Sequence, residues 1–392
     1  MEQPQCQRVS SHPTLVLLFV SFLKLGMTAF GGPAMVAYIR KMAVEQKKWL
    51  DEASFRNGVA LCQSLPGATA MMTSAYVGLR ARGVLGAAVS FIGFGLPAFC
   101  LMIILSILYV QTQSQPVAVS AFSGLRAIIV AIIANATISF GKSSLKSWRD
   151  IVIACVASTM FGLGVKPVLV ILLAALLGVI LYRRQSLLRG VTDSVTTMST
   201  ARPFALLVLV TTIGFVLLFI ANRRFFDLSV LVFKISLLAF GGGFTAVPLM
   251  LHEFVSVRSL MDSTTFMDGI VMGQITPGPI VITATFIGYW LYGLPGGLVA
   301  TVTVFLPSFL LVVGIVPYYD RLRKLVYFNR AIAGILPSFV GLLLSVNIRF
   351  ALNVPWNLYH AFFACVALVA LLLKVEIFWV VLIGIVISIL IL

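Results

Sequence analysis

The chain has 392 residues, of which 60% are hydrophobic and 10% are charged, and its mean hydropathy is +1.08. A soluble protein cannot expose so apolar a composition to water, so the sequence predicts an integral membrane protein. The 28 Lys and Arg residues against 12 Asp and Glu give a formal net charge of +16. These basic residues lie mainly in short loops between apolar stretches, where they orient a membrane protein. We therefore exclude nucleic acid as a partner.

Apolar segments follow one another along the chain, beginning at Leu15. The first six lie near residues 15 to 45, 54 to 76, 84 to 111, 118 to 140, 150 to 163 and 166 to 182. A polar, basic linker follows from Tyr182 to Arg202, and then eighteen uncharged residues, Phe204 to Ala221, predict one further span. Counterparts of the first six segments occupy residues 228 to 392. Several segments are too short or too interrupted to be simple membrane spans.

Two parts of the chain repeat each other at a separation of about 210 residues. Lys24-Leu-Gly-Met-Thr-Ala-Phe-Gly-Gly32 aligns with Lys234-Ile-Ser-Leu-Leu-Ala-Phe-Gly-Gly242. With one inserted residue, the pattern D-x3-F-x2-G-x4-Q-x2-P-G occurs both from Asp51 to Gly67 and from Asp262 to Gly278. A single gap suffices for the whole alignment, which indicates two homologous repeats.

The repeats predict an all-α polytopic membrane protein with inverted topology. An even number of crossings in each repeat, plus one connecting helix, turns the second repeat upside down relative to the first. We expect a first repeat at 1–182, a linker and connecting helix at 183–222, and a second repeat at 223–392, with thirteen spans and some broken half-helices. A re-entrant first segment in each repeat would lower the count of crossings by two and keep the inversion.

Basic residues predict the orientation. With the N-terminus in the cytoplasm, sixteen Lys and Arg residues fall on the inner side and eight on the outer side. The positive-inside rule therefore favours a cytoplasmic N-terminus and an external C-terminus in the cell (inner) membrane. The cluster from Arg40 to Lys48 falls on the outer side and fits this assignment poorly.

Lys24 and Lys234 lie inside apolar segments, where a charge costs about 2.5–3.5 kcal/mol at a helix centre. Their recurrence favours a cationic lining of a cavity over snorkelling of each side chain to the nearer membrane surface. No C-x-x-C pair, nucleotide-binding loop or catalytic constellation occurs in the chain, so we expect neither a cofactor or metal nor an enzymatic activity.

Glycine and proline motifs interrupt two apolar segments in each repeat. Irregular backbone at that depth is tolerated only where it is buried in protein or lines an aqueous cavity. A half-helix that starts there presents free N–H groups and a partial positive charge, which suits an anion. The alternative is that these glycines and prolines serve only close helix packing and kinks. The predicted anion-binding residues are Lys24, Lys234, Phe30, Gly31, Gly32, Phe240, Gly241, Gly242, Gln63, Pro66, Gly67, Gln274, Pro277 and Gly278.

Asp268 breaks the repeat symmetry, because Asn57 stands at the matching position of the first repeat. A protonatable residue present in one half only is a candidate for coupling transport to protons. Solvation of a helix end would explain it equally well.

Taken together, these motifs resemble the chromate ion transporter (CHR) family, in its long form with two homologous halves. The resemblance rests on K-x5-F-G-G and Q-x-x-P-G in both halves, Trp49-Leu50-Asp51 with Phe55, and the LP-x-F motif of Leu96 to Phe99. It implies export of chromate, a tetrahedral dianion, as a resistance mechanism.

The sequence thus predicts a secondary transporter that binds a tetrahedral dianion between two inverted repeats and works by alternating access. Sulfate or another oxyanion is the alternative substrate, and a passive anion channel is the alternative mechanism. The expected partners are a small oxyanion and the lipid bilayer, with the protein a monomer or a homodimer.

Overall fold

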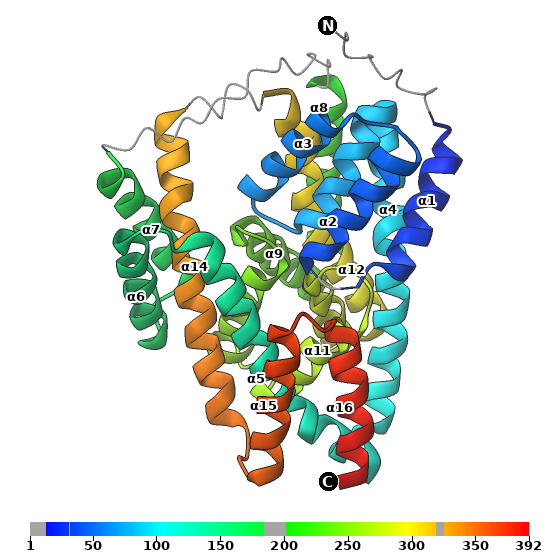
Figure 1. The fold of residues 1–392 in the computed structure, drawn as a ribbon. Coiled ribbons are helices and arrows are strands. Elements are labelled where there is room, and N and C mark those ends of the chain that lie inside the picture. The colour runs from blue at the N-terminus through cyan, green and yellow to red at the C-terminus, as the bar shows by residue number, and fades with distance from the viewer. Residues whose placement is uncertain (1–12, 31, 184–200, 319–324, 392) are drawn as a thin grey trace, which may run out of the picture.

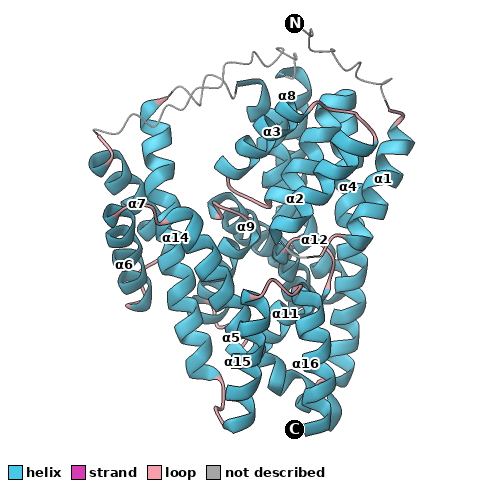
Figure 2. Cartoon of the chain, in the orientation of Figure 1, coloured by secondary structure: helices cyan, strands magenta, loops and turns pink. Residues whose placement is uncertain are grey.

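The computed structural model describes residues 13–30, 32–183, 201–318 and 325–391, and within these ranges the regular structure is helical (Figures 1 and 2). The first repeat contains seven α-helices and a π-helical extension of α2. They are α1 (Leu15–Thr28), α2 (Gly32–Arg40), η1 (Lys41–Gln46), α3 (Glu52–Ser64), α4 (Thr69–Thr112), α5 (Pro116–Ser144), α6 (Trp148–Gly162) and α7 (Pro167–Leu181). The connecting helix is α8 (Ala201–Ala221).

The second repeat has the same order of elements. They are α9 (Arg223–Leu238), η2 (Gly243–Thr245), α10 (Ala246–Met250), η3 (Leu251–Val257), α11 (Ser263–Ile275), η4 (Ile280–Ile282), α12 (Thr283–Ile315), η5 (Val316–Tyr318), α14 (Val326–Asn353), α15 (Leu358–Leu372) and α16 (Ile377–Ile391). Helices α9, α11, α12, α14, α15 and α16 correspond to α1, α3, α4, α5, α6 and α7. The expected all-α, inverted-repeat architecture is confirmed.

Helices α4 and α12 each fold back on themselves through a glycine with positive φ, Gly83 (+66°) and Gly293 (+64°). The two arms touch at paired glycines. A Cβ on Gly78 would lie 2.2 Å from the carbonyl oxygen of Gly86. A Cβ on Gly288 would lie 2.2 Å from the carbonyl oxygen of Gly296. The glycines that recur in the sequence therefore form a tight turn between a short arm and a long arm.

The expected thirteen spans are wrong, because most helices are too short to cross. In the described chain, five helices are long and apolar enough: α4, α5, α8, α12 with η4, and α14. Helix α1 has 14 residues and is about 21 Å long, against about 30 Å for the hydrocarbon core. The short helices instead form re-entrant pairs. Helix α1 begins at one end of the molecule and α16 ends at the other (Figure 1).

Contacts between helix ends define two faces. On the N-terminal face, Arg82 Nε donates to Pro13 O (2.7 Å), and Arg149 Nη1 donates to Leu181 O (3.0 Å). On the opposite, C-terminal face, Arg349 Nη1 donates to Ser256 Oγ (2.5 Å). Because α1 and α2 with η1 form a re-entrant pair, the cluster from Arg40 to Lys48 returns to the N-terminal face. The expectation that it lies on the other side is therefore wrong.

The repeated aspartates begin the helices α3 and α11. The carboxylates of Asp51 and Asp262 accept hydrogen bonds from the backbone N–H groups of Ser54 and Thr265, each at 2.8 Å. Burial alone would raise the pKa of Asp262, but the hydrogen bonds from Thr264 and Thr265 outweigh it and lower the pKa to about 2. The repeated Asp is thus a helix cap.

Replacing this cap tests its contribution to stability. We expect Asp262→Ala to lower the free energy of unfolding by about 0.5–2 kcal/mol, and Asp262→Ser to lower it much less, because serine also caps. The contribution of the carboxylate is present above its unfolded pKa, near 3.8, and is lost as the pH falls towards its folded value. Thermal unfolding of both purified variants measures the effect, and equal melting temperatures for Asp262→Ala and wild type would contradict it.

Candidate functional site

The broken segments of the two repeats meet each other in the middle of the protein. Gly67 N–H donates to Ala239 O (2.8 Å), and Gly278 N–H donates to Ala29 O (3.1 Å). Pro66 and Phe240 form an isolated antiparallel bridge. The Pro-Gly motif of each repeat therefore pairs with the Ala-Phe-Gly-Gly motif of the other. We call these four segments, the described residues 29–30 and 32 with 65–68, 239–242 and 276–279, the crossing.

The crossing requires glycine at defined positions. Gly67 and Gly278 have φ of +119° and +124°, and Gly241 and Gly242 have φ of +87° and +113°. A Cβ on Gly67 would lie 2.2 Å from Ser308 Oγ. A side chain at Gly67 would be excluded by both conformation and space. Gly31 lies outside the described residues, and Gly32 is the first residue of α2.

Helices that begin at the crossing differ in their N-terminal capping from helices that run towards it. The helices running towards the crossing, α1, α3, α9 and α11, are capped by the side chains of Thr14, Asp51, Asn222 and Asp262. The helical segments α4, η2 and η4, which run away from it, have no side-chain cap of their own. A helix start without a cap leaves N–H donors available. The crossing therefore offers donors and the positive ends of helix dipoles to an anion.

These uncapped starts are close together. A Cβ on Gly243 would lie 2.9 Å from Ile280 Cγ2, and one on Gly242 would lie 3.8 Å from Thr69 Oγ1. Ser308 Oγ accepts from Ala68 N–H (3.1 Å). Gln274 Nε2 is buried without a hydrogen-bond partner in the described part of the chain. An unused amide donor next to the Pro-Gly motif also suits an anion.

The predicted lysines lie one helical turn before the crossing and are exposed in the isolated chain. Thr28 Oγ1 donates to Lys24 O (3.2 Å), which places Lys24 just before the last turn of α1. Lys234 Nζ forms an ion pair with Glu253 Oε1 at 3.2 Å. Among the described residues no ion pair involves Lys24. The charge of Lys234 is thus partly balanced, whereas that of Lys24 is not.

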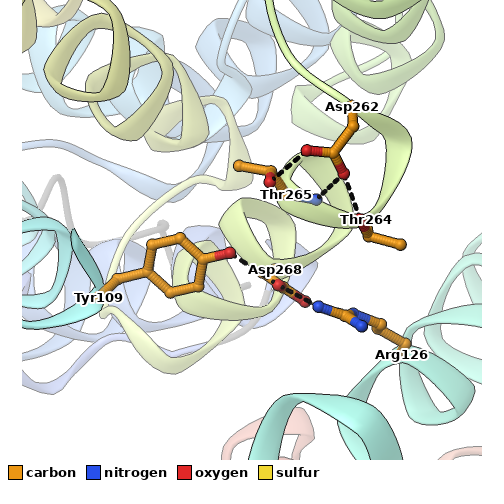
Figure 3. Close-up of polar contacts among 6 residues, drawn as sticks. All are labelled: Tyr109, Arg126, Asp262, Thr264, Thr265 and Asp268. Atoms are coloured by element: carbon orange, nitrogen blue, oxygen red, sulfur yellow. Dashed lines mark hydrogen bonds and ion pairs between the residues drawn. The ribbon is translucent and has the colours of Figure 1, made fainter. Parts of the chain in front are cut away.

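Asp268 does not face solvent but lies in a buried polar cluster with Arg126 and Tyr109 (Figure 3). Arg126 Nε and Nη2 donate to its two carboxylate oxygens at 2.9 and 2.7 Å. Tyr109 Oη donates to Oδ2 at 2.9 Å. The cluster joins α4 and α5 of the first repeat to α11 of the second. Asn57, at the matching position, is half-buried on α3.

Helices α3 and α11 match in sequence position but differ in burial. Helix α11 packs against α5 and α16, whereas α3 makes no comparable contact with α14 or α7. On one face of α3, Arg56, Ala60 and Gln63 are exposed. The counterparts of Arg56 and Ala60, Met267 and Val271, are buried, and that of Gln63, Gln274, is half-buried. A membrane-embedded arginine and glutamine do not face lipid cheaply, so this face of α3 is suited to water.

A family model of chromate transporters matches the chain twice, at residues 16–179 and 226–389. The chain belongs to the chromate transporter family. Both matches contain one complete set of the crossing motifs. Membership of a transporter family agrees with the absence of catalytic motifs from the sequence.

Several curated relatives resemble this member of the family along most of its length. An uncharacterised transporter of Methanocaldococcus jannaschii is 42% identical over 97% of this chain and 96% of its own. A chromate transport protein of Pseudomonas aeruginosa is 33% identical over 85% of this chain and 80% of its own. A chromate transport protein of Cupriavidus metallidurans is 31% identical over 93% of this chain and 90% of its own. No solved structure gives a significant match.

Sequence reasoning missed three features of the site. It gave no role to Arg126, Tyr109 or Ser308. Only Arg126 carried a signal, because a charge within an apolar run needs a counter-ion. Tyr109 and Ser308 are ordinary residues of apolar helices, and the fold alone brings them to Asp268 and Ala68.

Adding a methyl group at the crossing tests whether its geometry matters for transport. Gly67→Ala forces a strained φ, worth about 1–3 kcal/mol, and places Cβ against Ser308. We expect it to lower transport at least tenfold in vesicles containing equal amounts of protein. Ser308→Ala in the same chain should restore only part of the loss, since the φ strain remains. Gly214→Ala, in α8 with open space around it, should transport normally; equal rates for Gly67→Ala would contradict a role for the crossing.

Proposed function

We propose that the protein exports chromate from the cytoplasm by secondary transport with alternating access, binding the dianion at the crossing. The observation that carries this proposal is the meeting of Pro-Gly and Gly-Gly motifs from opposite repeats, with helix starts that have no side-chain cap of their own. Membership of the chromate transporter family supports the choice of substrate. Relatives named chromate transport proteins support it as well.

The crossing suits a tetrahedral dianion in its chemistry. Backbone N–H groups and the free amide of Gln274 supply donors, and Lys24 and Lys234 supply positive charge one turn away. Backbone donors in a site from which water is excluded bind an anion without requiring buried side-chain charges. Because sulfate has the same shape and charge as chromate, it is the natural competitor.

Charge distribution supports a cytoplasmic N-terminal face. Described basic residues at that face include Arg40, Lys47, Lys48, Arg80, Arg82, Lys142, Lys146, Arg149, Arg183, Arg202 and Arg330. Those at the C-terminal face are Arg223, Arg224, Arg258 and Arg349. The positive-inside rule again favours a cytoplasmic N-terminus. A negative cell interior favours dianion export by about 4.6 kcal/mol per 100 mV.

Unequal packing of the repeats supports alternating access. The exposed face of α3 and the closed packing of α11 fit a conformation open towards the N-terminal face. Rocking one repeat against the other would exchange the two environments. Coupling of transport to protons through Asp268 remains a prediction. Its counterpart Asn57 has no ionisable side chain. An Asp268→Asn protein that still concentrates chromate against a pH gradient would exclude it.

Uptake of labelled chromate into everted membrane vesicles tests the proposed function. We expect saturable uptake that excess sulfate inhibits and that the Lys24→Ala, Lys234→Ala variant reduces at least tenfold, because two positive charges are removed from beside the site. A correctly inserted wild-type protein without chromate uptake would contradict the proposal. Flux that rises without saturation would instead identify a channel.

Cysteine labelling tests the orientation. In a chain with its native cysteines replaced, Lys48→Cys should react with a membrane-impermeant maleimide only in everted vesicles. Arg224→Cys, from the opposite face, should react only in right-side-out cells. The reverse pattern would contradict a cytoplasmic N-terminal face and, with it, the proposed direction.

A further inference from the structure

We propose that Arg126 is the residue whose charge binds the substrate dianion directly, and that Asp268 occupies Arg126 as an internal anion until substrate replaces it. This inference rests on the proposed function and deepens it. It adds a binding residue that lies outside the crossing motifs.

Geometry at the ion pair supports this role. Two nitrogens of Arg126 point to the two oxygens of one carboxylate, at 2.9 and 2.7 Å. The same planar fork fits two oxygens of a tetrahedral oxyanion. The Arg126 side chain is 25% exposed, whereas that of Asp268 is 1% exposed. Arg126 is therefore the accessible member of the pair, and Asp268 is the buried one.

The repeat symmetry relates Arg126 to the crossing. Its counterpart on α14 is Leu336, whose Cδ2 would lie 3.3 Å from a Cβ on Gly241. Position 336 thus touches one Gly-Gly motif of the crossing. From the twofold relation between the repeats, we infer the corresponding place for position 126, beside the segment that holds Ala29 and Phe30.

Charge balance explains why the cluster occurs once. A buried arginine without a counter-ion is costly, so the site needs an anion in every state. Asp268 supplies that anion when substrate is absent, and a dianion can supply it when substrate is bound. The symmetry-related place offers neither group, because Asn57 of the first repeat matches Asp268 and Leu336 of the second repeat matches Arg126. One charged subsite predicts one dianion for each transport cycle.

A different reading is that the ion pair only holds α5 against α11. The two interpretations predict different substrate binding for a variant that removes both charges at once. Arg126→Gln with Asp268→Asn leaves no unpaired charge and keeps polar groups that can bond to each other. If the pair is a structural contact, substrate binding survives this change. If Arg126 binds substrate, the variant folds but loses affinity.

The experiment measures equilibrium binding of labelled chromate and of labelled sulfate to the full-length protein in lipid nanodiscs, with melting temperatures alongside. We expect the double variant to bind at least tenfold more weakly than wild type. We expect Asp268→Asn alone to bind at least threefold more tightly, since the competing carboxylate is gone. The matched control is Arg40→Gln with Glu52→Gln, which removes an exposed ion pair (2.8 Å) at the N-terminal face and should bind as wild type does.

Each outcome supports or overturns the role of Arg126. A folded double variant that binds within twofold of wild type overturns the role of Arg126 and leaves the proposed function standing. If the double variant does not fold, Asp268→Asn decides, and unchanged or weaker binding by that variant overturns the inference. Wild-type protein that binds neither anion overturns the proposed function together with the inference.

Discussion

A chain that breaks its helices inside a bilayer must find partners for the backbone groups it frees, because the hydrocarbon offers none. Here each repeat supplies the partners of the other. Gly67 and Gly278 donate to Ala239 and Ala29 across the interface between the repeats. Neither repeat could satisfy its own broken segments alone, so the crossing joins the two halves into one protein. The same arrangement brings helix starts together, and their remaining donors make the centre suitable for an anion.

The repeats share this framework but differ around it. Asp268, Arg126 and Tyr109 form a buried cluster in the half nearer the C-terminal face, while Asn57 and Leu336 cannot form its counterpart. Ser308 accepts from Ala68 N–H, and Ala98, its match, has no hydroxyl group. Exposed Arg56 on α3 stands where α11 has the buried Met267. The twofold relation therefore describes the backbone, whereas charge and solvation are specific to each half.

The crossing motifs could be predicted from the sequence because glycine, proline and lysine recur at fixed separations, and inverted repeats bring matched motifs together. The number of membrane spans could not be predicted in this way. Helices of about 15 residues and those of about 20 give similar apolar runs, and only tertiary structure shows that the short ones turn back. The pairing of Arg126 with Asp268 was equally hidden, since 142 residues separate them. Exposure of Lys24 and Lys234 also depends on packing that no local pattern encodes.

The most direct test of an anion site at the crossing is a crystal structure with bound chromate, in which anomalous scattering at the chromium absorption edge locates the metal. The account predicts one chromium peak within hydrogen-bonding reach, through its oxygens, of the helix starts near Thr69, Gly243 and Ile280. A peak confined to the surface near Lys24 or Lys234, with the crossing empty under saturating chromate, would contradict it.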